Sequence, residues 1–296
     1  MKMQTLMMLL LLCIFLMVPP FTQAQNPALY SQLDPRPYDP SVDANINLYI
    51  GNWRESVPRV THGTLIERDI LTQGDPQNPT ARGTVLSFVN RFTYATLSSH
   101  GVTTPTTLDG EQEIFYVISG TGLIYTGEKI TELSGGIAIL IPPGIEFSIS
   151  NTASESLTMF VISEPCTPGF RPNSEILVAN EHTTPYKQPM SHWVSLSKIL
   201  FSTQSGLAVL ENVVIVELHP MTFFHPHSHP EGCEEVWTAM TDNCYFLLGK
   251  EIRYQPSGTA YMIPPNGKTP HANFNVSDVT CKLFYFARYS DHKLRP

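Results

Sequence analysis

The 296-residue sequence lacks several features that would indicate familiar classes of protein. It has 18 Lys and Arg against 26 Asp and Glu and no run of basic residues, so we expect no nucleic-acid partner. Its five cysteines are too few for a disulfide framework in a chain of this length. The sequence leaves open whether any of them pair.

Long apolar runs are also scarce, and the one candidate lies at the N-terminus. Residues 6–18 are almost unbroken apolar sequence after Lys2. This run of about 13 residues is too short to span a bilayer comfortably, and small or polar residues lead from it to Ala24. We expect residues 1–24 to be a secretory signal peptide, with an uncleaved membrane anchor as the alternative. The mature protein is then secreted or periplasmic and has no membrane partner.

Segments with the 3.6-residue periodicity of helices are absent as well. The 25 prolines and 18 glycines would interrupt long helices. Short runs rich in Val, Ile, Phe, Tyr and Thr recur instead, for example at residues 113–118, 137–141 and 281–287. Turn residues separate these runs, which is typical of antiparallel strands. The pattern predicts an all-β protein, and the double-sheet jelly roll is the natural architecture.

The strand pattern is present twice. A second copy follows the first at a constant offset of 122 residues, as in the pairs Glu113 and Glu235, Gly127 and Gly249, and Gly136 and Gly258. Two extra residues in the second copy then align Phe147 with His271, and Asn151 with Asn275. The duplication predicts two tandem β-barrels. Their expected bounds are 61–165 and 195–296, after an N-terminal arm at 25–60 and joined by a linker at 166–194.

The second copy contains a cluster of residue types that bind metals. His227 and His229 are separated by one residue, Glu235 follows, and His271 lies beyond a proline-rich turn. A ligand set of imidazoles and a carboxylate, without thiolate, is typical of a site for Mn, Fe, Ni, Cu or Zn, and less typical of a structural zinc site, which uses cysteines. Cys233 lies beside them and is interpreted as an inert buried thiol rather than a soft ligand. The cluster predicts a site for one divalent transition metal.

These spacings resemble the two conserved motifs of the cupin family. The first motif has paired histidines followed by a glutamate, as in His227, His229 and Glu235, and the second ends in a histidine three residues before an asparagine, as in His271 and Asn275. The resemblance implies a bicupin of two tandem jelly-roll barrels. It also implies that His227, His229, Glu235 and His271 are the metal ligands.

Departures from the motif leave two alternatives open. One residue too many separates His229 from Glu235, so Glu234 is an alternative ligand. A shifted register would use His225, His227 and Glu231 instead. In the preferred register His225 lies next to the ligands, where it fixes a tautomer or carries a proton. The candidate catalytic residues are therefore Glu235, Glu234 and His225.

The first copy retains little of the motif. Thr104 and Thr106 stand near the positions of the histidine pair, and Phe147 replaces the histidine of the second motif. Glu113 alone remains, and one carboxylate does not hold a transition metal. We expect the first barrel to lack metal and to act as a structural partner.

The resemblance implies a range of functions rather than one. The family includes dioxygenases, oxalate-degrading enzymes, lyases and sugar isomerases, but also storage and sugar-binding proteins without chemistry. Fold alone therefore does not decide function. Because one barrel keeps a complete ligand set, we expect an exported metalloenzyme for a small oxygen-rich substrate, with a non-catalytic small-molecule or sugar-binding cupin as the alternative. Self-association into a homo-oligomer is a further expectation from the family.

Overall fold

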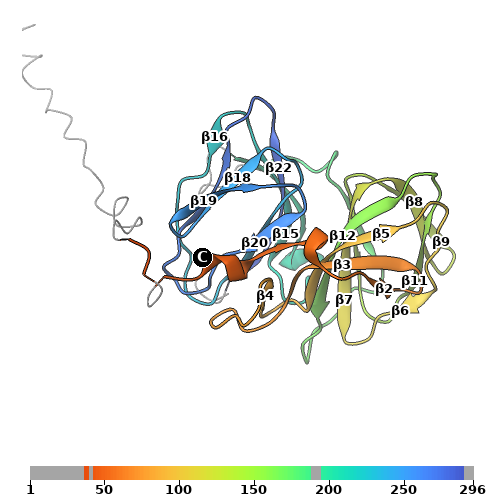
Figure 1. Cartoon of the computed structure of the whole chain (residues 1–296). Coiled ribbons are helices and arrows are strands. Elements are labelled where there is room, and N and C mark those ends of the chain that lie inside the picture. Colours follow the sequence, from red (N-terminus) through yellow and green to blue (C-terminus); the bar gives the residue numbers. More distant parts are fainter. Residues whose placement is uncertain (1–36, 40–42, 188–194, 290–296) are drawn as a thin grey trace, which may run out of the picture. The chain divides into compact units, whose positions relative to one another are not determined.

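The computed structural model describes residues 37–39, 43–187 and 195–289 (Figure 1). The predicted signal peptide lies outside the described residues, as do parts of the predicted arm and linker. Pro37–Pro296 cluster as one compact unit, so both predicted barrels belong to it. No helix in the described part of the chain is long and apolar enough to cross a membrane.

The first barrel consists of a large and a small antiparallel sheet, coloured orange to green in Figure 1. The large sheet has the order β13 (Leu177–Asn180), β10 (Ile137–Ile141), β7 (Glu111–Ser119), β12 (Leu157–Pro165), β5 (Arg91–Leu97), β3 (Leu65–Gln73) and β2 (Arg59–Thr61), with β4 (Thr84–Leu86) pairing parallel to β3. The small sheet has the order β6 (Thr106–Thr107), β11 (Glu146–Asn151), β8 (Thr121–Thr126) and β9 (Lys129–Ser134).

The second barrel repeats this topology. Its large sheet has the order β1 (Ile50–Asn52), β20 (Thr259–Met262), β17 (Glu234–Ala239), β22 (Cys281–Arg288), β15 (Asn212–Leu218) and β14 (Ser195–Ser202). Its small sheet has the order β16 (Thr222–Phe223), β21 (His271–Asn275), β18 (Cys244–Leu248) and β19 (Glu251–Gln255). The helical elements of the described residues are three short 3-10 turns, η1 (Ile46–Tyr49), η2 (Trp53–Glu55) and η3 (Thr203–Ser205). The prediction of an all-β fold with two tandem jelly-roll barrels is confirmed.

A shared glycine shows why the two copies align. Gly127 connects β8 to β9, and Gly249 connects β18 to β19 at the same place in the second barrel. Their φ angles are 60° and 62°, in the left-handed region. Glycine adopts this region without the steric cost that a Cβ atom imposes, so the same tight turn retains glycine in both copies.

Strands outside the two predicted barrels complete the edges of the large sheets. β1 precedes the first barrel in sequence but pairs with β20 of the second. β13 follows the first barrel and pairs with β10 of that barrel. The predicted arm therefore supplies a strand to the second barrel, and the predicted linker supplies one to the first. Pairing also protects the exposed sheet edge that each barrel would otherwise present.

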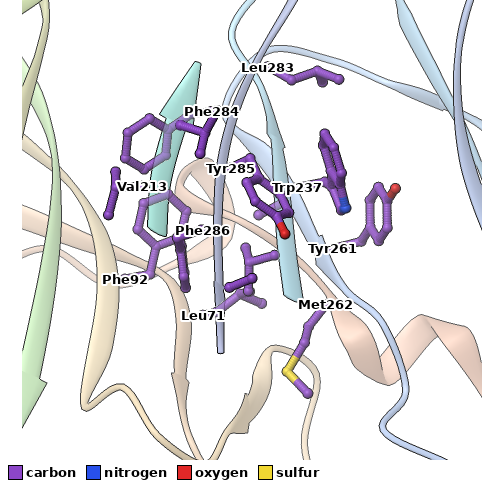
Figure 2. Close-up of a cluster of buried hydrophobic side chains, with 14 of the residues drawn as sticks. Leu71, Phe92, Val213, Trp237, Tyr261, Met262, Leu283, Phe284, Tyr285 and Phe286 are labelled. Carbon is purple, nitrogen blue, oxygen red and sulfur yellow. The ribbon is translucent and has the colours of Figure 1, made fainter. Parts of the chain in front are cut away.

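Aromatic side chains fill the contact between the two large sheets. Phe92 of β5 lies 5.1 Å from Phe286 and 5.9 Å from Phe284, both on β22, measured between ring centroids. All three rings are fully buried. Figure 2 shows Phe92 and Leu71 of the first barrel among side chains of the second. Removing a buried phenyl ring typically costs about 3–5 kcal/mol, so this contact couples the stability of the two barrels.

The structure also decides the cysteine pairing that the sequence left open. Cys244 at the start of β18 and Cys281 at the start of β22 form a disulfide, which joins the small and large sheets of the second barrel. Cys166 and Cys233 form no disulfide in the described part of the chain. Cys233 is buried, whereas Cys166 is half-buried.

Candidate metal centre

Three structural elements of the second barrel bring the predicted ligands together. His271 is the first residue of β21 and Glu235 lies on β17, while His227 and His229 lie in the segment that joins β16 to β17. The backbones of His227 and His271 exchange two hydrogen bonds, with N–O distances of 3.2 and 2.9 Å. This bridge fixes the first motif against the second, so residues far apart in sequence face one interior.

The distances fit a shared cation site. His229 Nε2 lies 2.9 Å from Glu235 Oε2, and His271 Nε2 lies 3.1 Å from Glu235 Oε1. One ring nitrogen from each of His227, His229 and His271 lies within 4.8 Å of the other two. A second group with the same spacing contains His229, Cys233 and Glu235. The two groups share His229, and together they contain all four predicted ligands and one additional cysteine.

The protonation states also suit a metal. His271 is fully buried, and burial lowers its pKa below the ordinary value, which keeps the imidazole neutral with a lone pair at pH 7. Burial alone would raise the pKa of Glu235, but the charge of His229 and the hydrogen bonds from both histidines hold it well below the ordinary value. Nε2 of His271 is buried and faces Glu235 Oε1, so the neutral ring protonated at Nδ1 would offer the Nε2 lone pair to a metal beside this carboxylate. The residues therefore fit a divalent transition metal.

His225 lies at the edge of this centre and not inside it. Its side chain is exposed, and only residues 222–223 of this segment are regular strand, so the three histidines do not share one strand face. The His225 carbonyl oxygen lies 3.0 Å from Nδ1 of His227. Because a carbonyl only accepts hydrogen bonds, Nδ1 of His227 carries the proton and Nε2 is left for a metal. The backbone carbonyl of His225, and not its side chain, therefore fixes the tautomer of His227.

Glu234 points away from the centre, which corrects its candidacy as ligand and catalytic residue. Successive residues of a strand face opposite sides of the sheet, so Glu234 and Glu235 diverge. The Glu234 carboxylate accepts hydrogen bonds from the backbone amides of Ser87 and Phe88, in the loop between β4 and β5. The shifted register is not assembled either, because Glu231 is exposed and belongs to neither ligand group of the described residues.

Glu164 shows that the contact of Glu234 is part of a symmetric arrangement. In the first barrel Glu164 lies on β12 and accepts hydrogen bonds from the amides of Val209 and Leu210, at 3.0 and 2.7 Å. Each barrel thus uses a buried carboxylate to hold a loop of the other barrel. The role of Glu234 is to anchor the barrels to each other.

Three aromatic residues that sequence analysis did not assign to the site surround Glu235. Trp237 Nε1 donates to Glu235 Oε1 at 2.6 Å, and the hydroxyls of Tyr285 and Tyr289 each lie 3.3 Å from Oε2. The two hydroxyls are 2.8 Å apart. The i, i+2 relation of Trp237 to Glu235 on one strand could have indicated the first contact. Tyr285 lies on β22 and Tyr289 directly follows it, and no sequence signal connects them with the motif.

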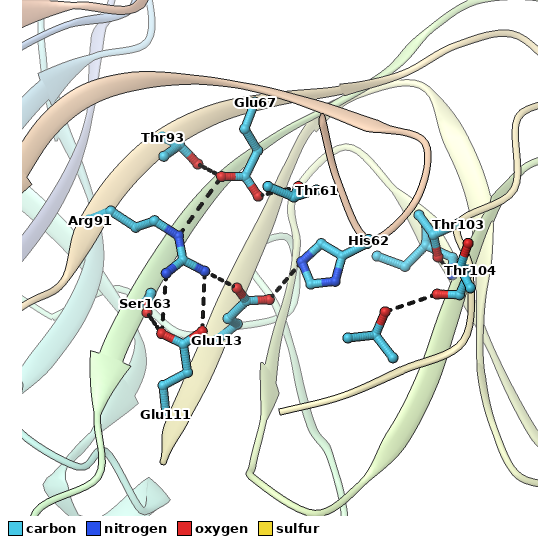
Figure 3. A network of polar contacts seen from close by, with 12 residues as sticks. Thr61, His62, Glu67, Arg91, Thr93, Thr103, Thr104, Glu111, Glu113 and Ser163 are labelled. Carbon is cyan, nitrogen blue, oxygen red and sulfur yellow. Dashed lines mark hydrogen bonds and ion pairs between the residues drawn. The ribbon is translucent and has the colours of Figure 1, made fainter. Parts of the chain in front are cut away.

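The corresponding position of the first barrel is occupied by an internal ion network, shown in Figure 3. Glu113 Oε1 lies 2.6 Å from a guanidinium nitrogen of Arg91, and Oε2 lies 3.1 Å from His62 Nε2. The ring of His62 packs against Phe147, with 5.4 Å between the centroids. The backbone amide of Thr104 donates to the His62 carbonyl at 2.8 Å. The β2–β3 turn therefore places His62 in the interior, beside the retained carboxylate.

Comparisons with known proteins agree with this architecture. Residues 94–163 match the family model of the cupin domain. No curated protein sequence matches the chain.

Solved structures extend the likeness to most of the chain. Oxalate decarboxylase from Bacillus subtilis is similar with a TM-score of 0.61 at 12% identity, over 85% of this chain and 80% of that one. Vicilin from hazelnut, Corylus avellana, has a TM-score of 0.61 at 13% identity, over 82% of this chain and 86% of that one. The YlbA protein from E. coli has a TM-score of 0.57 at 16% identity, over 81% and 97%. Residues 94–163 therefore carry a cupin domain, and the solved structures show the same fold of two tandem jelly-roll barrels over most of the chain.

Proposed function

We propose that the protein is an exported metalloenzyme that acts on a small oxygen-rich molecule, such as an organic acid, a sugar acid or an aromatic compound. One divalent transition metal would be held by His227, His229, His271 and Glu235. The observation that carries the proposal is the convergence of three imidazoles in the second barrel, two of which lie within 3.1 Å of one buried carboxylate. When bound, such a metal supplies Lewis-acid or redox chemistry.

The residues around Glu235 hold the carboxylate in a defined orientation. Trp237 donates to one oxygen and the two tyrosine hydroxyls approach the other. Partners of this kind fix ligand geometry and tune the metal, and their loss typically lowers metal affinity or activity about 10–100-fold. Because Glu235 has partners on both oxygens, its first role is to bind the cation. A role as general base requires that it leave the metal.

Tyr285 and Tyr289 support the choice of an oxygen-rich substrate. Burial, and then the negative charge of Glu235, raise the pKa of Tyr285 well above its ordinary value. The phenol therefore stays protonated at neutral pH and remains able to donate a hydrogen bond. In the structure both hydroxyls are directed at Glu235 Oε2. Once a metal binds this carboxylate, the hydroxyl protons would be available to a carboxylate, carbonyl or hydroxyl oxygen of a substrate.

The Cys244–Cys281 disulfide supports export. Structural disulfides persist in oxidising compartments such as the periplasm and the extracellular space, and are rare in the cytosol. The predicted signal peptide at residues 1–24 supports the same localisation.

Metal analysis of purified mature protein tests the proposal. We expect about one transition metal per chain, and loss of that metal in His229→Ala and His271→Ala. His62→Ala is the matched control, because it removes a buried histidine beside the carboxylate of the first barrel. Purification without stoichiometric metal, together with wild-type ligand binding in both site variants, would contradict the metalloenzyme. A retained metal without turnover of any organic acid, sugar acid or aromatic compound would favour the non-catalytic alternative. Redox-active Fe, Cu or Ni would favour dioxygen chemistry, and Zn or Mn would favour a lyase or isomerase.

A further inference from the structure

Cys233 lies two residues before Glu235, at the entrance to β17. Residues two apart on an extended segment point to the same side, so the thiol and the carboxylate face one interior. Cys233 is 4% exposed. Its sulfur lies within 4.8 Å of both the nearest ring nitrogen of His229 and the nearest oxygen of Glu235. We propose that Cys233 is a further ligand of the metal, bound through Sγ next to Glu235. This inference rests on the proposed metal site.

The first barrel contains a direct precedent for two ligating positions on this strand. Glu111 and Glu113 stand at the places of Cys233 and Glu235, 122 residues earlier. Both bind one cation, since Arg91 places Nη1 3.1 Å from Glu111 and Nη2 2.6 Å from Glu113 (Figure 3). The two positions therefore direct their side chains at a common point in the duplicated fold.

The second barrel has no arginine at the equivalent place. Arg91 pairs with Ser163, which pairs with Glu113. In the second barrel Asn212 pairs with Ala287, which pairs with Glu235. Asn212 therefore stands at the place of Arg91, and its amide side chain carries no charge. The paired positions 233 and 235 thus retain their geometry while the internal cation of the first barrel is missing. A metal ion is the cation that the neighbouring histidines are suited to hold.

Charge balance favours the thiolate. Three neutral imidazoles and one carboxylate leave a divalent metal with one uncompensated positive charge in a buried site, which is costly. A bound thiolate removes this charge, and its proton leaves to solvent as the metal binds. Sulfur also makes the donor set softer, so the site would select Zn, Cu or Fe rather than Mn. The interpretation of Cys233 as an inert thiol, drawn from the sequence, is then replaced.

Cobalt absorption tests this assignment on the full mature chain. We expect apo wild-type protein titrated with Co²⁺ to develop a near-ultraviolet sulfur-to-cobalt charge-transfer band. Cys233→Ser should still bind Co²⁺ without that band, and should bind Zn²⁺ about tenfold or more weakly, the order of effect seen when groups at a metal site are changed. Cys166→Ser is the matched control and should keep the band. An unchanged spectrum and Zn²⁺ affinity in Cys233→Ser would overturn the assignment while leaving the metal site intact.

Alkylation of wild-type protein gives a second reading that needs no variant. Zn²⁺ should slow the reaction of Cys233 with iodoacetamide, followed by peptide mass spectrometry, and leave the rate at Cys166 unchanged. Equal rates at Cys233 with and without bound Zn²⁺ would overturn the assignment. Failure of every variant and of wild type to bind Co²⁺ or Zn²⁺ would instead overturn the proposed metal site, and this inference with it.

Discussion

Glu113 and Glu235 occupy the same position in the two barrels but pair with different partners. Glu113 is neutralised from within the chain, by Arg91 at 2.6 Å and by His62 at 3.1 Å. Glu235 faces His229 at 2.9 Å and His271 at 3.1 Å. Burial lowers the pKa of His271, so this imidazole is neutral. One scaffold thus holds a carboxylate that has its own cation and a carboxylate suited to a cation from solution.

Metal binding should stabilise the folded protein. A ligand that binds only the native state adds about 2.7 kcal/mol when its concentration is 100 times Kd. We expect added metal to raise Tm of EDTA-treated wild-type protein, and to leave Tm of His271→Ala unchanged. Differential scanning calorimetry measures both. A similar shift in His271→Ala would place the metal elsewhere.

Glu234→Ala should destabilise the protein without removing the metal. The carboxylate accepts bonds from two backbone amides of the other barrel, and its loss leaves them dependent on water. We expect a cost of about 2 kcal/mol in the free energy of unfolding, measured by urea denaturation. Glu164→Ala, the reciprocal change, should cost a similar amount. Loss of metal stoichiometry in Glu234→Ala would show that Glu234 acts as a ligand after all.

The contribution of His62 to stability should fall as pH rises. Burial opposes its charge, but the hydrogen bond and charge of Glu113, together with Glu67, outweigh burial and the repulsion of Arg91, so its pKa lies above the ordinary 6.5. A pKa raised by folding stabilises the protein fully below the unfolded value, and this stabilisation is lost as pH rises through the folded value.

His62→Asn should therefore destabilise the protein more at about pH 5.5 than at about pH 8.5, in urea unfolding at each pH. Asparagine tolerates the positive φ of 46° at this residue. His100→Asn is the matched control, because His100 is exposed and has a φ of 53°. An equal loss at both pH values would contradict a charged His62.

Reduction of the Cys244–Cys281 disulfide should weaken the second barrel. The bond closes a loop with a sequence separation of 37 residues, for which chain entropy gives a contribution of roughly 4 kcal/mol. We expect Cys244→Ala/Cys281→Ala to lower the urea midpoint of unfolding, and reductant to lower it in wild type. Wild-type protein with an unchanged midpoint in reductant would contradict a stabilising bond.

Sequence periodicity and repetition determined the fold class and most of the ligand set. Short runs of β-forming residues gave β10 and β22 nearly to their bounds, because alternation and flanking turn residues are local signals. The offset that pairs Glu113 with Glu235 also placed Glu235 in the site. A loop that binds Glu234 of the other barrel separates β4 from β5, and strand propensity does not indicate this interruption.

Tertiary structure decided what depends on contacts between distant segments. The alternation of side chains along β17 separates Glu234 from Glu235. Only the fold shows that Glu234 reaches Ser87 and Phe88. Tyr289, the residue after β22, approaches Glu235, and the edge strand β1 pairs with β20 of the barrel that is more distant in sequence. Such contacts depend on how sheets pack, and packing leaves no periodic signal in the chain. The sequence by itself determined which residues can bind a metal, whereas the tertiary structure decided which of them face one another.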